Sequence, residues 1–293
     1  MLLKEWLIIG IHINNREVTI MTPKTMMKKT MIKNRSMLTG KPIVALLALT
    51  LLGLHCPAQA DLLKNILSDG VLKVGTTGDY KPFTYLNQDH YTGYDIDVAN
   101  HIARQMGVKV EFVKTTWKHL TTGLQAGEYD IAMGGITKRM NRQLVAEISH
   151  GYMTFGKCFL VATGLENKFD TLEKVNKPDV RVGVNIGGTN EKFARQYLPN
   201  AQIIRFDNNL DVPVAVAEGK IDVMITETPE ALYYQHKDKR LDAVREHDPF
   251  TKSQFGYLIP AGEQRLLNAI NYAMEDMQLK GTDIQLMKKN GLM

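Results

Sequence analysis

The strongest constraint on the fold is an alternation of short apolar strands with amphipathic helices, which occurs twice along the chain. The first run predicts strands, with helices between them, at 71–77, 108–113 and 129–133. The second run predicts strands at 180–186, 201–206 and 221–225, with helices at 190–197, 210–218 and from 229. Strands that alternate with helices of about ten residues form parallel βαβ units, so each run predicts one α/β lobe.

Two extended segments connect these lobes. The helical pattern stops around 153–161, and a second extended segment follows at 255–259. The last helices, near 263–278 and 282–289, have no strand of the second run left to complete. We therefore expect two strands to cross between the lobes, near 155–160 and 252–258, with lobe 1 formed by 61–156 and 255–293 and lobe 2 by 157–254. A chain of this design places a cleft for a small ligand between its lobes.

The first 60 residues are expected to lie outside the fold. Residues 27–41 are basic, 43–54 form an apolar run, and 58–60 read Ala-Gln-Ala. These three features are typical of a secretory signal, with cleavage near Ala60 and an N-terminal extension before it. The apolar run is too short to span a membrane, because a span needs about 20 residues.

Removing this leader changes the charge of the chain. The whole sequence has a net charge of +5, but residues 1–60 hold eight of its 36 basic side chains and two of its 31 acidic ones. The remainder has a net charge of −1, so the sequence does not favour nucleic-acid binding. Cys158 is the only cysteine after the leader, which excludes an internal disulfide. The histidines lack metal-ligand spacing, so we expect no metal.

One stretch, 182–195 (VGVNIGGTNEKFAR), combines a short strand, a glycine turn and the start of a helix. Gly187 and Gly188 allow a sharp turn, and Thr189 or Asn190 can cap the helix. Such a turn leaves free N–H groups that can hold a carboxylate. An ordinary strand-to-helix turn has the same pattern, so both interpretations stay open at this stage.

Four further motifs carry a family resemblance: VGTTGDYKPFTY, GYDIDVANHIA, YDIAMGGIT and EGKIDVMITE. With them, residues 61–291 resemble the family-3 extracellular solute-binding proteins. The resemblance implies the periplasmic-binding-protein type II fold, with two α/β lobes, two crossing strands and a central ligand cleft. It also implies a periplasmic protein that binds polar amino acids for an ABC importer.

Within that family, three motifs are most similar to the cyclohexadienyl dehydratases, namely TTGDYKPF, GGTNEKFAR and the T-E-x-x-E-A run at 226–231. This resemblance implies a lyase of phenylalanine biosynthesis that needs no cofactor. It would convert prephenate to phenylpyruvate and L-arogenate to L-phenylalanine by decarboxylative dehydration. The alternative is an amino-acid-binding protein that passes its ligand to an ABC permease without catalysis.

The resemblance also assigns a binding site. It makes Arg142, five residues after Thr137, the carboxylate-binding arginine, with Arg139 as the alternative in the same stretch. A guanidinium suits this role because it donates two parallel hydrogen bonds to a carboxylate. Trp117 is expected to form an aromatic wall, although a large aromatic residue can equally belong to the core. The substrate-binding residues implied in this way are Tyr80, Trp117, Thr137, Arg142, Thr189, Asn190 and Glu227.

Glu230 is the implied catalytic residue. A protonated carboxyl that gives its proton to the departing hydroxyl is a general acid. The alternative is a plain helix start, since Thr228-Pro229-Glu230 supplies a cap, a proline and an acid in the first turn. The helix dipole lowers the pKa of a carboxyl at this position, whereas burial and the nearby charge of Glu227 raise it. We expect burial and like charge to dominate when substrate is bound.

Overall fold

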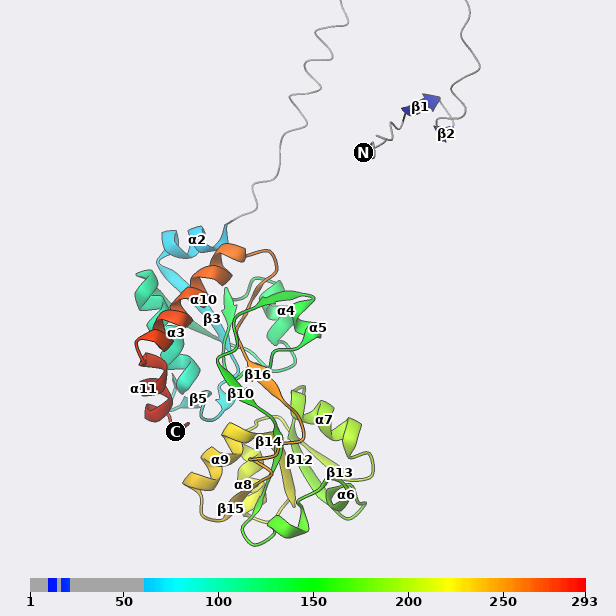
Figure 1. Ribbon diagram of the computed structural model, residues 1–293, viewed down its shortest axis with the longest axis vertical. Helices are drawn as coiled ribbons and strands as arrows, with labels where there is room; N and C mark the ends of the chain where they lie inside the picture. The colour runs from blue at the N-terminus through cyan, green and yellow to red at the C-terminus, as the bar shows by residue number, and fades with distance from the viewer. Residues whose placement is uncertain (1–9, 15–16, 22–60) are drawn as a thin grey trace, which may run out of the picture. The chain divides into compact units, whose positions relative to one another are not determined.

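The computed structural model describes residues 10–14, 17–21 and 61–293 (Figure 1). An antiparallel hairpin, β1 (Gly10–Asn14) with β2 (Glu17–Met21), belongs to a unit of its own, and residues 59–293 form a second unit. The predicted signal peptide and its cleavage site near Ala60 lie outside the described residues.

The first sheet of the second unit has five strands in the order β7-β3-β8-β17-β9. β3 pairs in parallel with β7 and β8, whereas β17 pairs antiparallel with β8 and β9. The strands are β3 (Val71–Thr76), β7 (Lys109–Lys114), β8 (Ile131–Ala132), β9 (Ala146–Ile148) and β17 (Leu258–Pro260). The helices of this lobe are α2 (Leu62–Asp69), α3 (Tyr94–Met106), α4 (Leu120–Gln125), α5 (Met140–Gln143), α10 (Gln264–Leu279) and α11 (Thr282–Lys289).

A small three-stranded sheet belongs to the same lobe and consists of β4 (Asp79–Tyr80), β5 (Thr84–Asn87) and β6 (His90–Thr92). Its first strand, β4, carries Tyr80, one of the residues predicted to bind substrate. The strand ends at Tyr80, two residues before Pro82, which has no N–H to donate to a ladder.

The second sheet has the order β13-β12-β14-β11-β15. β12 pairs in parallel with β13 and β14, and β11 pairs antiparallel with β14 and β15. The strands are β11 (Lys157–Ala162), β12 (Arg181–Asn185), β13 (Gln202–Phe206), β14 (Val223–Glu227) and β15 (Leu241–Val244). Its helices are η2 (Glu166–Lys168), α6 (Leu172–Val175), α7 (Thr189–Tyr197), α8 (Asp211–Ala217) and α9 (Thr228–Lys237).

Two short strands, β10 (Met153–Phe155) and β16 (Ser253–Phe255), pair antiparallel and run between the two sheets (Figure 1). The rings of Phe155 and Phe255 stack with their centroids 3.8 Å apart. The predicted two-lobe α/β fold is therefore confirmed. The first crossing is shorter than expected, because residues from Lys157 onward already belong to the second sheet.

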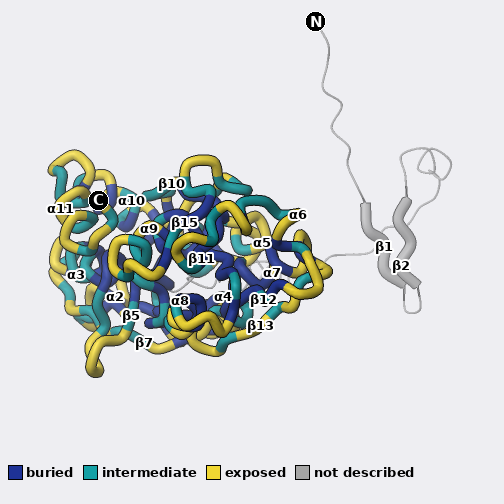
Figure 2. Tube along the Cα trace, turned by 90° about the horizontal axis from the view of Figure 1, so that it is seen from below, coloured by how far each residue is buried: buried dark blue, intermediate teal, exposed yellow. Residues whose placement is uncertain are grey.

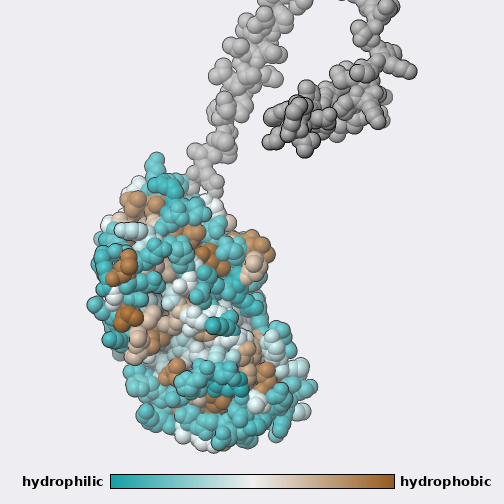
Figure 3. All heavy atoms as spheres, viewed as in Figure 1, coloured by the Kyte–Doolittle hydropathy of each residue, from teal (hydrophilic) through white to brown (hydrophobic). Residues whose placement is uncertain are grey.

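Each lobe has its own hydrophobic core. The inner strands of both sheets are largely buried, whereas the edge strands β7 and β13 contain no buried residue, and helices and loops carry most of the exposed residues (Figure 2). The face seen in Figure 3 is mostly hydrophilic, with hydrophobic residues in scattered patches. The apolar faces of the helices pack on the sheets, which is how each lobe removes its hydrophobic surface from water.

Candidate functional site

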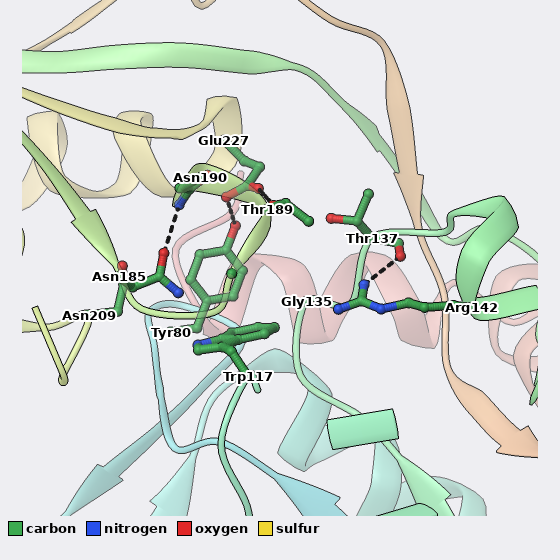
Figure 4. Close-up of a pocket in the computed structure, with 11 residues that line it drawn as sticks. Tyr80, Trp117, Gly135, Thr137, Arg142, Asn185, Thr189, Asn190, Asn209 and Glu227 are labelled. Atoms are coloured by element: carbon green, nitrogen blue, oxygen red, sulfur yellow. Dashed lines mark hydrogen bonds between the residues drawn. The ribbon is translucent and has the colours of Figure 1, made fainter. Parts of the chain in front are cut away.

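A small cavity lies between the lobes (Figure 4). Its volume is about 20 Å³, which is enough for one water molecule. The structure places all seven residues predicted to bind substrate in its wall. The lining residues are Tyr80, Trp117, Gly135, Thr137 and Arg142 from lobe 1, and Asn185, Gly188, Thr189, Asn190, Asn209 and Glu227 from lobe 2.

Glu227 ends β14 and accepts hydrogen bonds in the cavity wall. Its Oε2 accepts a hydrogen bond of 2.7 Å from the Tyr80 hydroxyl, which comes from the other lobe. Its Oε1 accepts one of 3.0 Å from Thr189 and forms an ion pair with Lys157. Burial raises the pKa of Glu227, but the charge of Lys157 and these hydrogen bonds outweigh burial and hold the pKa below its usual value.

Lys157 is a buried charged residue beside the candidate site that sequence reasoning missed. It is 6 % exposed at the start of β11, and its Nζ donates to Thr189, Asn190 and Glu227. Burial lowers the pKa of this lysine, while Glu227 opposes the change. The available signal was a single charged residue inside the apolar run FGKCFLVA. A charged side chain at such a position needs a buried partner.

Arg142 lies on α5 and presents its guanidinium to the cavity (Figure 4). Its Nη1 donates to the carbonyl oxygen of Thr137 at 2.7 Å, and this hydrogen bond helps to orient the guanidinium group. Burial, followed by the charge of Arg139, lowers the pKa of Arg142 from 12.5 to about 10, so the side chain stays charged at neutral pH. Arg139, the alternative from the sequence, is exposed and does not line the cavity.

Tyr80 and Trp117 form an aromatic corner of the cavity. Their rings meet edge to face, with centroids 5.7 Å apart. Trp117 also packs against the core and donates from Nε1 to Asp79 at 3.0 Å. It separates the cavity from a second, larger hollow of about 600 Å³, which it also lines. Trp117 therefore both lines the cavity and packs against the core, which are the two alternatives that the sequence left open.

Gly135 gives a prediction about this corner. A Cβ on this residue would lie 2.3 Å from Cε1 of Tyr80, and the backbone has φ of 63°, which disfavours a side chain. We expect Gly135→Ala to lower the free energy of unfolding by about 1–3 kcal/mol through this clash, beyond the backbone strain. The control is Gly107→Ala, where φ is 73° and nothing lies within 4 Å of the added Cβ. Urea unfolding of both variants measures the difference, and equal losses would contradict the proposed clash.

The glycine turn after β12 differs from the predicted carboxylate cradle. The N–H of Gly187 donates to the chain's own Glu191 at 2.8 Å, because this glutamate folds back from the first turn of α7. Thr189 and Asn190 do not cap the helix, as the N-cap residue is Gly188. Their side chains instead accept from Lys157, so the turn contributes side chains to the site.

Glu230 lies in the first turn of α9, after Pro229, as the sequence predicts. Its carboxyl is fully buried. Oε1 accepts from Asn209 Nδ2 at 2.7 Å, and Oε2 accepts from the hydroxyl of Thr226. Burial, together with the charges of Glu227 and Asp79, raises the pKa of Glu230 well above 4.5 against these two hydrogen bonds. Glu230 does not line the cavity itself; Asn209, to which it is bonded, does.

Asp95, another residue that the sequence did not single out for the site, connects the cavity to the crossing strands. Its carboxylate accepts from the N–H of Gly135 at 2.5 Å, from the Tyr152 hydroxyl at 2.9 Å and from the Tyr257 hydroxyl at 2.7 Å. Gly135 lines the cavity, and the two tyrosines flank β10 and β16. This carboxylate therefore holds together the cavity wall and both connections between the lobes.

The burial of Asp95 predicts a pH effect on stability. Burial raises its pKa from 3.8 to about 6. The folded protein thus keeps this proton to a higher pH than the unfolded chain. The resulting stability is complete below about pH 4 and is lost as pH rises through 6, on the order of 3 kcal/mol. We expect urea unfolding to show this loss between pH 4 and 7 in the wild type but not in Asp95→Asn. Parallel pH profiles for the two proteins would contradict the assignment.

Two further observations concern the described residues alone. Within residues 10–14, 17–21 and 61–293, every helix is too short or too polar to cross a membrane. Over the same part of the chain, no three His, Cys, Asp or Glu side chains gather as a metal ion would require.

Comparison with protein families matches residues 72–292 to the model for bacterial extracellular solute-binding proteins, family 3. The cyclohexadienyl dehydratase of Pseudomonas aeruginosa is 39 % identical over 207 residues, which cover 70 % of this chain and 77 % of that protein. The L-cystine-binding protein TcyJ of Escherichia coli is 28 % identical over 251 residues, which cover 85 % and 92 %.

Solved structures that match this chain also include an amino acid-binding protein and a cyclohexadienyl dehydratase. The ancestral amino acid-binding protein AncCDT-1, a precursor of cyclohexadienyl dehydratase, matches with a TM-score of 0.72 and 39 % identity over 78 % of this chain and 98 % of that one. An ancestral cyclohexadienyl dehydratase, AncCDT-3, is 52 % identical over 78 % and 96 %, with a TM-score of 0.50. These matches confirm the predicted periplasmic-binding-protein type II fold.

Proposed function

Because the chain belongs to the bacterial extracellular solute-binding proteins of family 3, we propose that it is a periplasmic cyclohexadienyl dehydratase. It would convert prephenate to phenylpyruvate and L-arogenate to L-phenylalanine. The observation that carries this proposal is Glu230, a fully buried carboxyl with a raised pKa, one hydrogen bond away from a cavity that contains Arg142. The identity to the dehydratase of Pseudomonas aeruginosa supports it.

The reaction needs one proton donor. Protonated Glu230 gives its proton to the ring hydroxyl of the substrate, the C–O bond breaks, and water leaves with the electron pair of that bond. The bond between the ring and its carboxylate then supplies electrons to the ring, which becomes aromatic, and CO₂ departs. Solvent returns the proton to Glu230. General acid catalysis of this kind contributes about 10²–10⁴-fold to a rate.

The other residues of the cavity are assigned to binding. Arg142 would hold a carboxylate from lobe 1, and Thr189 and Asn190 would hold the opposite end of the ligand from lobe 2. Tyr80 and Trp117 would pack against the ring. A cavity of about 20 Å³ cannot contain prephenate, so the lobes must separate and close again around the substrate. Closure would exclude water from the reacting groups.

The second candidate is an amino-acid-binding protein of an ABC importer. Glu227 favours it, because a buried carboxylate with a lowered pKa can pair with the ammonium group of an amino acid. Arg142 in the same cavity would then hold the α-carboxylate. The similarity to an L-cystine-binding protein supports this alternative.

Incubation of the purified protein with prephenate separates the two candidates. Phenylpyruvate formed in large molar excess over protein indicates the dehydratase. A stoichiometric complex with an amino acid, without turnover of prephenate or L-arogenate, indicates the carrier. Recovery of the protein in a periplasmic extract tests the proposed export.

A further inference from the structure

Asn209 lies in the loop between β13 and α8 and contacts both lobes. Its side chain is 1 % exposed and lines the cavity. Its Nδ2 donates to Oε1 of Glu230 at 2.7 Å, and its backbone N–H donates to Oδ2 of Asp79, in lobe 1, at 3.4 Å. Asp79 in turn accepts from Trp117 Nε1 at 3.0 Å. Asn209 thus joins the buried carboxyl of lobe 2 to the aromatic corner of lobe 1.

The other polar atom of the same amide, Oδ1, is buried and has no hydrogen-bond partner among the described residues. Nearly all buried polar side-chain atoms in proteins have a partner, and leaving one unpaired costs about 1–3 kcal/mol. A lone acceptor in the wall of a ligand cavity is satisfied when the ligand brings a donor. A ligand that placed an N–H or O–H group beside Oδ1 of Asn209 would therefore satisfy this acceptor.

The surroundings select the kind of donor. Glu227 already offers a carboxylate for a cationic group, and it is paired with Lys157. Asn209 offers a neutral carbonyl oxygen instead, and its other side binds Glu230, a fully buried carboxyl whose raised pKa favours the neutral form. A neutral hydroxyl is the donor that suits this position.

We propose that Asn209 recognises the ring hydroxyl of the ligand through Oδ1 while its Nδ2 holds Glu230 beside that hydroxyl. This inference rests on the proposed function and adds a substrate-contacting residue to it. Oδ1 and Nδ2 are bonded to one carbon, so a hydroxyl at the first atom is a neighbour of the carboxyl held by the second. The hydroxyl hydrogen points at Oδ1, which leaves an oxygen lone pair for the proton of Glu230. Both hydrogens then leave in the water molecule.

The contact with Asp79 would make this arrangement depend on closure. The backbone of Asn209 meets Asp79 only when the lobes touch, and Asp79 is itself held by Trp117. Asn209 would therefore be positioned to accept from the ligand hydroxyl in the same closed state in which Trp117 is positioned. Opening of the lobes would release the loop and the product together.

Two ligands that differ only in the ring hydroxyl provide the test, namely 4-hydroxyphenylpyruvate and phenylpyruvate. We expect titration calorimetry to show about 10-fold tighter binding of the hydroxylated compound to the wild type, which corresponds to one buried hydrogen bond. Asn209→Ala and the nearly isosteric Asn209→Leu should abolish this preference and lower kcat/KM for prephenate by about 10-fold or more. The neighbouring Asn208→Ala should retain both, because Asn208 is exposed and lies outside the cavity.

The outcomes separate this inference from the proposed function. Wild-type turnover with an unchanged preference in both Asn209 variants overturns the role of Asn209 and leaves the dehydratase intact. A preference that depends on Asn209, in a wild type that does not turn over prephenate, supports hydroxyl recognition and rejects the dehydratase. A wild type that binds both compounds equally also rejects the inference. The Leu variant keeps the test valid if the Ala variant does not fold.

Discussion

Glu230→Gln is expected to lower kcat for prephenate by about 10²–10⁴-fold while substrate affinity changes little. Glutamine preserves the shape and the hydrogen bonds, because its oxygen can accept from Asn209 and its amide can donate to the Thr226 hydroxyl. It lacks only the transferable proton. Single-turnover kinetics with prephenate measure the chemical step, and calorimetry with a product measures binding.

The matched control for this substitution is Glu173→Gln. Glu173 also lies in the first turn of a helix, α6, but it is exposed and does not line the cavity. If Glu230 were only a helix-start acid, the two variants would behave alike and turnover would survive in both. Full turnover by Glu230→Gln would reject the assignment and leave the amino-acid carrier as the better proposal.

The pH profile gives a second readout for the same residue. Burial raises the pKa of Glu230, and the acid is active while it is protonated. We therefore expect kcat to be constant below this pKa and to fall as pH rises through it. The raised pKa also makes the stability contribution of Glu230 decrease over the same rise in pH. Both effects should be absent in Glu230→Gln.

The fold was predictable because its main signal is local. Apolar periodicity predicted the parallel strands β3 and β12. The loss of the helical pattern predicted the two segments that cross between the lobes. The direction of the remaining strands was not predictable in the same way. β11 and β17 pair antiparallel with strands that are distant in sequence, so nothing in their own residues specifies the direction. The domain boundaries assigned from the sequence remain a prediction.

The candidate site was predictable where a motif carried it. Tyr80, Arg142 and Glu227 stand in motifs that resemble a known family, and the structure brings them to one cavity. Lys157 and Asn209 were missed, since each depends on partners supplied by other segments of the chain. A lysine in an apolar run indicates that a buried partner exists but does not identify it, and an asparagine in a polar loop has no role that its neighbours in sequence reveal.

Lys157→Met is the second substitution with a large expected effect, this time on stability. It should lower the free energy of unfolding at pH 7 by about 3–5 kcal/mol, because removing one partner of a buried ion pair leaves the other charge uncompensated. Glu227 is 3 % exposed and would keep only the hydrogen bonds from Tyr80 and Thr189. Urea unfolding monitored by circular dichroism measures the loss.

The control is Lys220→Met, which breaks the ion pair with Glu218 on the surface. Exposed pairs contribute little to stability because water and salt screen their charges, so this variant should unfold almost like the wild type. Equal losses for the two lysines would show that Lys157 is not paired in the interior.

The double variant Lys157→Met with Glu227→Gln identifies the cause of the loss. Glutamine can accept from one of the Tyr80 and Thr189 hydroxyls through its oxygen and donate to the other through its amide, and it carries no charge that needs Lys157. If the cost of Lys157→Met comes from an isolated buried carboxylate, the double variant should regain most of the lost stability. If the cost comes from the packing of the methionine, the second substitution should recover nothing. Recovery would therefore mean that a neutral pair can replace this ion pair in folding.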